Sequence, residues 1–454
     1  MSSDRLRTAF DVTHMVSRLI VNEPTGIDRI DLAFARHFIR PDVSGANADF
    51  TGGIHYGNHH ERLHSPAQTA KILELAEHFW QEKPQANFNA ADDAPFNRLR
   101  DWLASTPGTP FEKLDVTKPE RSGPYGKSSK SWLYSKYRSL RMTQLRLAQN
   151  RSVQIPQGAI YLNIAQHQLE NPWRLTWLDR RPDLRKVFFI FDLLSIDYPE
   201  YFRPDNYDLF RRRLATALHH ADAFLVSAQS VKTRLEEEMR ALGERPRPIH
   251  VGYFPSPLAL DNNPTPIVQP ERDATGHPYF IIVGTIEPRK NHLLLLQLWR
   301  EMIRENPNAP RLLIIGGRGW ECEQVVDLLD RSPVLRNHVA EVSGVPSAQL
   351  NRLVHGAQAL LMPTFDEGYG LPVVEALSMG TPAIASDIPV FREIMQDCAI
   401  LRSPLDGPGW KSAILQMADR NSEYHKDARQ RAARFVAPAW PEYFADLEAF
   451  LATL

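Results

Sequence analysis

Residues 359–382, ALLMPTFDEGYGLPVVEALSMGTP, constrain the fold of this chain more than any other stretch. The first five form a short apolar run, which is typical of a buried strand. Pro372 suits the first turn of a helix, where a missing N–H costs no hydrogen bond, and Gly380 suits the position that ends it. The stretch therefore predicts a strand, a glycine-containing loop and a short helix. Free backbone N–H groups at the start of that helix predict an anion site.

Two glutamates accompany this predicted unit. Glu367 lies in the loop after the strand, and Glu375 lies about one turn into the helix, with seven residues between them. Both carboxylates can face one crevice and accept hydrogen bonds from the hydroxyl groups of a ligand. A single glutamate in a loop is usually only solvated, so the functional interpretation depends on the whole arrangement.

Apolar runs alternate with helical patterns twice along the chain, which predicts an α/β fold with two parallel sheets. A proline-rich stretch separates the two series. The predicted organisation is therefore an N-terminal domain with an irregular insertion at about 40–155, a linker, a C-terminal domain and a terminal helix. Their respective bounds are 1–255, 256–278, 279–435 and 436–454.

Composition narrows the classes of protein to consider. The chain has 454 residues, 43% of them hydrophobic, and a formal net charge of −1, so we expect no nucleic-acid partner. Cys322 and Cys398 are its only cysteines, which excludes a disulfide framework. The N-terminus lacks an apolar signal core, and no apolar run approaches the roughly 20 residues of a membrane span. We therefore expect a cytoplasmic protein.

Residues 121–151 form a basic segment with interleaved aromatic residues. Such a segment can form an amphipathic helix that lies on an anionic bilayer. The alternative is a helix that packs on the core and exposes a basic outer face. The sequence leaves both open, and the first would place the protein peripherally at the inner face of the cytoplasmic membrane.

The start of the chain predicts a strand at residues 6–12 and then a helix beside Gly26. The loop between them, residues 17–26, either covers a ligand or is an ordinary connection. Apolar residues recur at helical spacing after it. They are Ile27, Ile30, Phe34 and Phe38. We expect Asp28, Arg29 and Asp31 to line the start of this helix or its solvent face.

Two adjacent cations, Arg289 and Lys290, lie where a predicted strand gives way to a helix, in a loop that opens at Gly284. Arginine offers phosphate a rigid fork of donors, and lysine offers a mobile point charge. Because the ends of parallel strands share one edge of the sheet, these cations and the predicted anion site can hold a diphosphate from both sides. Asp192 and Asn163 each follow a predicted strand of the first series.

This combination resembles the retaining glycosyltransferases of the GT-B fold, family GT4, which have two Rossmann-like domains facing across a cleft. The match covers most of residues 279–402. The region 155–255 is a looser match that resembles bacterial polysaccharide mannosyltransferases, whereas 40–150 depart from the family pattern. The stretches that carry the resemblance are GTIEPRKNH (284–292), residues 343–394 with the two glutamates, and TGIDRI (25–30).

The resemblance implies four residues close to the chemistry. Arg289 and Lys290 would bind the donor diphosphate and stabilise it as it leaves. Glu367 would contact the donor sugar near the reacting carbon, and Asp192 would face the sugar from the other domain.

The resemblance also implies a set of donor contacts. Glu375 would bind the ribose diol, and Gly26 would lie under the phosphates. Backbone N–H groups of the loop would reach sugar and phosphate. With the two cations, the remaining donor-binding residues are Gly284, Gly368, Tyr369, Gly370 and Leu371.

The implied reaction is transfer of a hexose with retention, from GDP-mannose to a glycan or lipid-linked oligosaccharide of a surface polysaccharide. Neither a cofactor nor a metal ion is expected. Transfer from UDP-glucose or another nucleotide sugar and epimerisation by an enzyme of the same fold remain alternatives, as does a catalytically silent membrane scaffold. An NAD(P) enzyme would require a G-x-G-x-x-G motif, which residues 316–319 do not match.

Overall fold

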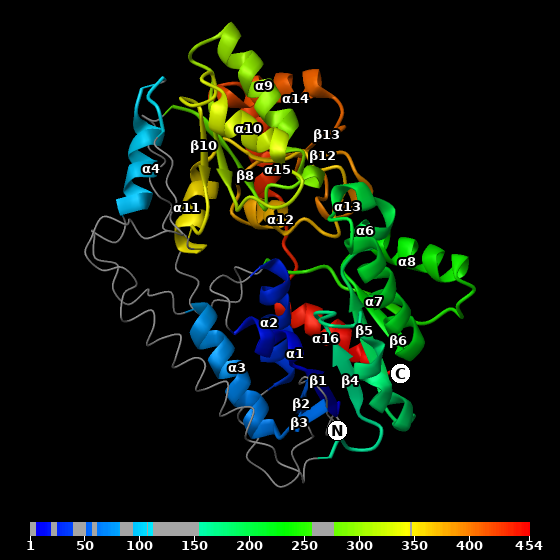
Figure 1. Ribbon diagram of the computed structural model, residues 1–454. Coiled ribbons are helices and arrows are strands. Elements are labelled where there is room, and N and C mark those ends of the chain that lie inside the picture. The colour runs from blue at the N-terminus through cyan, green and yellow to red at the C-terminus, as the bar shows by residue number, and fades with distance from the viewer. Residues whose placement is uncertain are drawn as a thin grey trace.

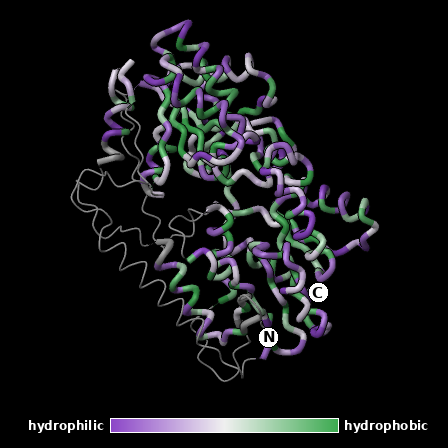
Figure 2. Tube along the Cα trace, viewed as in Figure 1, coloured by the Kyte–Doolittle hydropathy of each residue, from purple (hydrophilic) through white to green (hydrophobic). Residues whose placement is uncertain are grey.

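The computed structural model of the protein has two α/β domains, one above the other in Figure 1. The structure describes residues 6–19, 25–39, 51–56, 61–81, 94–106, 108–111, 154–256, 277–345 and 347–454. Figure 2 shows apolar residues gathered along the sheets of both domains, where the two sets of buried strands form the cores.

The N-terminal domain contains a sheet with strand order β3-β2-β1-β4-β5-β6-β7. Every neighbouring pair is parallel except β2 and β3, which are antiparallel. The prediction of a parallel sheet is therefore confirmed apart from this edge. The strands are β1 (Thr8–Asp11), β2 (Thr51–Tyr56), β3 (Glu61–His64), β4 (Ile160–Asn163), β5 (Arg185–Ile190), β6 (Ala223–Val226) and β7 (Ile249–Val251).

The C-terminal domain contains a wholly parallel sheet with strand order β10-β9-β8-β11-β12-β13. Because β8 and β11 are neighbours, the connections after them leave in opposite directions, and ligands of open α/β sheets bind at such a point. The strands are β8 (Tyr279–Val283), β9 (Arg311–Ile315), β10 (Val339–Val342), β11 (Leu360–Met362), β12 (Ala383–Ser386) and β13 (Ile400–Arg402).

Helices cover both sheets. In the first half of the chain they are α1 (Thr13–Arg18), α2 (Gly26–Phe38), α3 (Pro66–Gln81), α4 (Ala94–Ala104), η2 (Pro172–Arg180), α6 (Leu194–Asp197), η3 (Pro199–Tyr201), α7 (Asn206–His220) and α8 (Gln229–Ala241). In the second half they are η5 (Pro288–Lys290), α9 (His292–Glu305), α10 (Glu323–Arg331), α11 (Ser347–Gly356), α12 (Leu371–Ser378), α13 (Pro389–Ile394), α14 (Gly407–Ala418), α15 (Glu423–Ala433) and α16 (Trp440–Leu451).

Helix α2 begins where the sequence predicts it, because Thr25 and Asp28 form a reciprocal capping box. Asp28 lies in the first turn of α2, as expected, but neither Asp28 nor Asp31 lies on a solvent face, since both are buried. They face α1, which the sequence did not predict. Arg18 Nη2 lies 2.8 Å from Asp28 Oδ2, and His14 Nδ1 lies 2.9 Å from Asp31 Oδ2.

The two domains exchange elements. Helix α16, at the end of the chain, packs on α2 of the N-terminal domain, where Phe444 stacks on His37 with ring centroids 3.9 Å apart. In the opposite direction, α4 lies beside the C-terminal sheet (Figure 1). The fully buried Arg311 of β9 donates to the carbonyl oxygens of Trp102 and Thr106 at the end of α4. Part of the segment interpreted as an N-terminal insertion thus packs on the C-terminal domain.

The basic segment 121–151 lies outside the described residues, so its predicted helix is not tested. Within the described ranges, no helix combines the length and the apolar character needed to cross a bilayer.

Candidate active site

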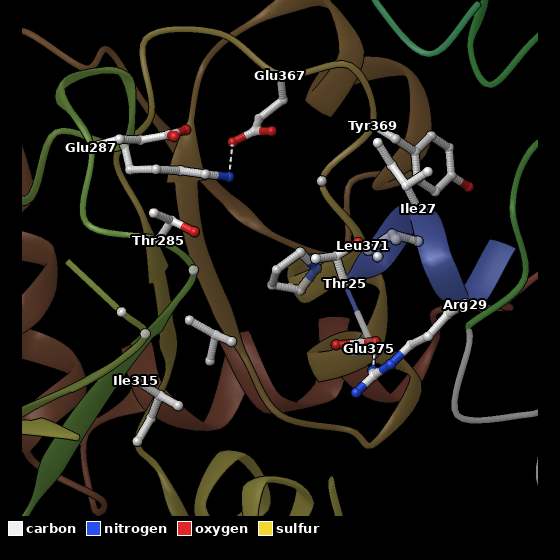
Figure 3. A pocket seen from close by; sticks show the side chains of 18 of the residues that line it. Thr25, Ile27, Arg29, Thr285, Glu287, Ile315, Glu367, Tyr369, Leu371 and Glu375 are labelled. Carbon is white, nitrogen blue, oxygen red and sulfur yellow. Dashed lines mark hydrogen bonds and ion pairs between the residues drawn. The ribbon is translucent and has the colours of Figure 1, made fainter. Parts of the chain in front are cut away.

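A cleft of about 1330 Å³ lies between the two domains, at the strand ends identified above. The loops after β8, β9 and β11 line it from the C-terminal domain, and the start of α2 with the loops after β5 and β6 lines it from the N-terminal domain (Figure 3). The structure brings together every residue that the sequence placed in the site. These residues are Gly26, Asp192, Gly284, Arg289, Lys290, Glu367, Gly368, Tyr369, Gly370, Leu371 and Glu375.

Strands β8 and β11 are neighbours, and the loops that follow them place Arg289 and Lys290 beside Glu367. The backbone oxygen of Arg289, after β8, accepts hydrogen bonds from the Phe365 N–H and the Thr364 hydroxyl, after β11, at 2.9 and 3.0 Å. Asn291, in the left-handed conformation with φ of 56°, then starts α9. The prediction that the two loops share one edge of the sheet is therefore confirmed.

Glu367 is the centre of a buried ionic cluster. Its Oε1 lies 2.5 Å from Lys290 Nζ and 2.9 Å from Arg289 Nη1, and Arg289 Nη2 lies 2.7 Å from Glu287 Oε1. Burial alone would raise the pKa of Glu367, but the two cations outweigh it and lower this pKa to about 2. The carboxylate is therefore ionised, and an incoming phosphate must compete with it for both cations.

The start of α12 has the predicted geometry. Gly370 has a φ of 95°, in the left-handed region, Leu371 and Pro372 are the first helical residues, and Gly380 follows the helix with a φ of 69°. Two of the predicted glycines lie where the domains meet. A Cβ on Gly368 would lie 2.8 Å from the Phe191 oxygen, and a Cβ on Gly26 would lie 3.1 Å from the Leu371 side chain.

Asp192 lies two residues after the end of β5 and reaches the cleft opposite Gly368. Its Oδ1 accepts a hydrogen bond from the Leu194 N–H at 3.1 Å. Burial raises the pKa of Asp192, and Arg289 opposes this increase. Asn163, the other strand-end residue, does not line the cleft. Its side chain instead donates to the buried carboxylate of Asp11 at 2.8 Å.

Glu375 lies on α12, at the far end of the cleft from Glu367 (Figure 3). Its Oε1 lies 3.6 Å from Nη1 of Arg29, which comes from α2 of the other domain. Burial raises the pKa of Glu375, and Arg29 opposes the increase. Sequence reasoning gave Arg29 no role beyond the start of the helix or its solvent face.

The glycine loop after β9 is a second feature that sequence reasoning did not assign to the site. A Cβ on Gly316 would lie 1.9 Å from the Gly284 oxygen, so only glycine allows these two loops to touch. Arg318 follows it, with its Nε 2.7 Å from Glu341 Oε1. The Gly316-Gly317 pair was the available signal, but residues 316–319 were used only to argue against an NAD(P) motif.

A possible metal site lies elsewhere. In the described part of the chain, one group of three side chains could share an ion, namely Asp179, His219 and His220 on η2 and α7. None of them lines the cleft.

Comparison with known proteins identifies the domain that holds Glu367 and Glu375. Residues 266–430 match the family described as glycosyl transferases group 1. The chain contains a glycosyltransferase group 1 domain. This match confirms the resemblance that the sequence predicted for the C-terminal half.

Curated relatives of the chain include bacterial mannosyltransferases. The chain is 30% identical over 223 residues to the serotype-specific mannosyltransferase WbdA of Escherichia coli, which is 47% of this chain and 27% of WbdA. It is 34% identical over 165 residues to the O-antigen chain mannosyltransferase RfbU of Salmonella typhimurium, which is 35% of this chain and 42% of RfbU. The chain thus matches less than half of the length of either relative.

The solved structure of Anabaena HepE in complex with UDP and glucose has the same architecture as this chain. The TM-score is 0.56 at 14% sequence identity, and the alignment covers 99% of this chain and 100% of HepE. The two domains, of which the C-terminal one contains the group 1 match, form a GT-B fold, as predicted.

Proposed function

We propose that the chain is a retaining glycosyltransferase that moves mannose from GDP-mannose to a glycan or lipid-linked oligosaccharide during surface polysaccharide synthesis. The observation that carries this proposal is the buried pairing of Arg289 and Lys290 with Glu367, in a cleft between the two domains that also holds Glu375. The mannosyltransferase names of WbdA and RfbU support the choice of sugar.

In this proposal the cations bind the diphosphate of the donor. A diphosphate that enters between Lys290 and Glu367 would pair with the cations that Glu367 now neutralises. Because charge develops on the diphosphate as the glycosidic bond breaks, fixed cations in a buried site stabilise the transition state more than the bound donor. No resident metal ion is required for this role.

The remaining residues orient the ribose, the phosphates and the hexose of the donor. Glu375 accepts hydrogen bonds from the ribose hydroxyls, and the N–H groups of residues 368–371 reach sugar and phosphate at the start of α12. Glu367 and Asp192 approach the sugar from the two domains. The acceptor hydroxyl attacks from the face that the diphosphate leaves, and the diphosphate takes its proton.

A thermal-shift screen against GDP, UDP, ADP, TDP and NAD tests the proposal. A ligand at 100 times its dissociation constant adds roughly 2.7 kcal/mol to the stability of the protein. Selective stabilisation by GDP supports GDP-mannose as donor, and selective stabilisation by UDP moves the proposal to another hexose donor. A shift with NAD alone, or with none of them, would contradict it. Conversion of the nucleotide sugar without an acceptor would instead indicate an epimerase.

We also propose that residues 121–151 contact anionic membrane and bring the enzyme to a lipid-linked acceptor at the inner face of the cytoplasmic membrane. The charge and the aromatic residues of this segment support the idea. Neutralising Lys130, Lys136, Arg138 and Arg141 together should then abolish binding to vesicles that contain phosphatidylserine. Unchanged binding would refute it.

A further inference from the structure

One side chain of the N-terminal domain crosses the cleft to Glu375 of the other domain, the residue proposed to bind the ribose of the nucleotide sugar. Arg29 lies in the first turn of α2 and points toward α12, where its Nη1 lies 3.6 Å from Glu375 Oε1 (Figure 3). Its Nη2 also donates to the hydroxyl of Ser347, at the start of α11, at 3.1 Å. Both of these partners belong to the C-terminal domain.

We infer that Arg29 is a positioning residue, supplied by the opposite domain, that holds the Glu375 carboxylate ready for the ribose of the donor. This inference rests on the proposed function, in which Glu375 binds that ribose. It adds a residue from the opposite domain to the donor site.

The environment of Glu375 explains why it needs such a partner. Its side chain is 14% exposed, and burial favours the neutral acid. A neutral carboxyl group turns one of its acceptor oxygens into an O–H donor, so it accepts hydrogen bonds from two ribose hydroxyls more weakly than an ionised carboxylate does. Among the described residues, Arg29 is the only charged group that counters this effect of burial on Glu375.

The position of Arg29 is set by the fold. The capping box of Thr25 and Asp28 fixes the first turn of α2, and a Cβ at Gly26 would already lie 3.1 Å from Leu371. Helix α2 therefore touches the start of α12, and the next turn of α12 carries Glu375. If the domains separated, Arg29 would withdraw from Glu375 together with the whole of α2.

Other contacts across the cleft do not involve the Glu375 carboxylate. The Ser227 hydroxyl donates to the Gly368 oxygen at 3.1 Å, and Glu393 accepts from the N–H groups of Gln229 and Ser230 at the start of α8. These contacts can hold the domains together when Arg29 is replaced. Substitution of Arg29 therefore tests its effect on Glu375 with the remaining interface intact.

The test is calorimetric titration of the full chain with GDP and with UDP between pH 5 and 8. Arg29→Met should raise the dissociation constant of the nucleotide that binds about tenfold at pH 7, the usual effect of losing one charged partner. Arg29→Met should also raise the pH at which binding is lost on acidification, because the pKa of Glu375 rises without the arginine. Arg29→Lys should restore most of both. Arg431→Met, which removes an exposed arginine paired with Asp427 on α15, is the matched control and should change neither.

A double substitution separates positioning from direct contact. In a Glu375→Gln background, Arg29→Met should have no further effect, because Arg29 acts through that carboxylate. A further loss of affinity would overturn the inference and indicate direct contact with the nucleotide. An unchanged dissociation constant and pH profile in Arg29→Met would also overturn it, as would tighter binding.

The same titrations distinguish failure of the inference from failure of the proposed function. If Glu375→Gln and Lys290→Ala both weaken nucleotide binding and Arg29→Met does not, only the inference fails. If neither Glu375→Gln nor Lys290→Ala weakens it, the proposed donor site fails and the role of Arg29 fails with it. Melting temperatures within a few degrees of wild type confirm that each variant is folded.

Discussion

Gly368→Ala should open the cleft without unfolding either domain. The new Cβ would lie 2.8 Å from the Phe191 oxygen and 2.9 Å from Asp192 Cβ, both in the N-terminal domain. Gly368 does not have a positive φ, so the clash between domains is the main cost of the added methyl group. Overpacking of this kind costs about 1–3 kcal/mol, which corresponds to nucleotide binding about 5- to 150-fold weaker if binding requires the closed cleft.

Two measurements check this prediction. Calorimetry gives the dissociation constant of the nucleotide, and small-angle X-ray scattering gives the radius of gyration, which should rise as the domains separate. The melting temperature should change little, because separation of the domains relieves the clash and leaves both cores intact. Gly407→Ala is the control, since its Cβ would make only ordinary contacts at 3.7 Å with Leu294 and 3.8 Å with Leu298. Unchanged affinity with an unchanged radius in Gly368→Ala would refute the reasoning.

Three further predictions concern buried charges. Glu367→Gln should destabilise the C-terminal domain by about 3–5 kcal/mol in urea unfolding at pH 7, because Arg289 and Lys290 lose their shared counter-ion. A loss of stability below about 1 kcal/mol would contradict this prediction. Since folding lowers the pKa of Glu367 from 4.5 to about 2, its contribution of about 3 kcal/mol should be present above pH 4.5 and disappear as the pH falls toward 2. Burial alone would lower the pKa of His14, but Asp31 and Asp28 outweigh this effect and raise the pKa above 6.5. The protonated His14 side chain should therefore stabilise the fold fully below pH 6.5, and this stabilisation should decline as the pH rises above that value. Urea unfolding of wild type and His14→Gln at pH 6 and pH 8 checks this, and equal differences at the two values would contradict it.

Local signals in the sequence were sufficient to predict the strand–loop–helix unit at the centre of the site. Pro372 and Gly380 fix the ends of α12 through their own backbone chemistry, whatever lies around them. The neighbouring position of the Arg289 loop followed from a general property of parallel sheets. These arguments placed Glu367, Glu375 and the two adjacent cations at one edge of the sheet, and the resemblance to the GT4 family supplied the other residues of the cleft.

Features that depend on a partner distant in sequence were predicted wrongly or not at all. The start of α8 at Gln229 is one such feature, since Glu393 of the other domain accepts its first N–H groups. The burial of Asp28 and Asp31 was not predicted, because their partners lie on α1, a helix that the sequence did not predict. Arg29 lies on the same helix, and only the position of the second domain shows that it faces Glu375.

The most direct test of the account is whether a nucleoside diphosphate binds at Lys290. Wild-type protein and Lys290→Ala should be titrated with GDP and UDP under identical conditions, with circular dichroism as a check on folding. One nucleotide should bind the wild type, and Lys290→Ala should bind it at least about tenfold more weakly because a charged phosphate contact is lost. Equal affinity in a folded variant would show that the diphosphate does not bind between Lys290 and Glu367, and it would contradict the assignment of the cleft as a donor site.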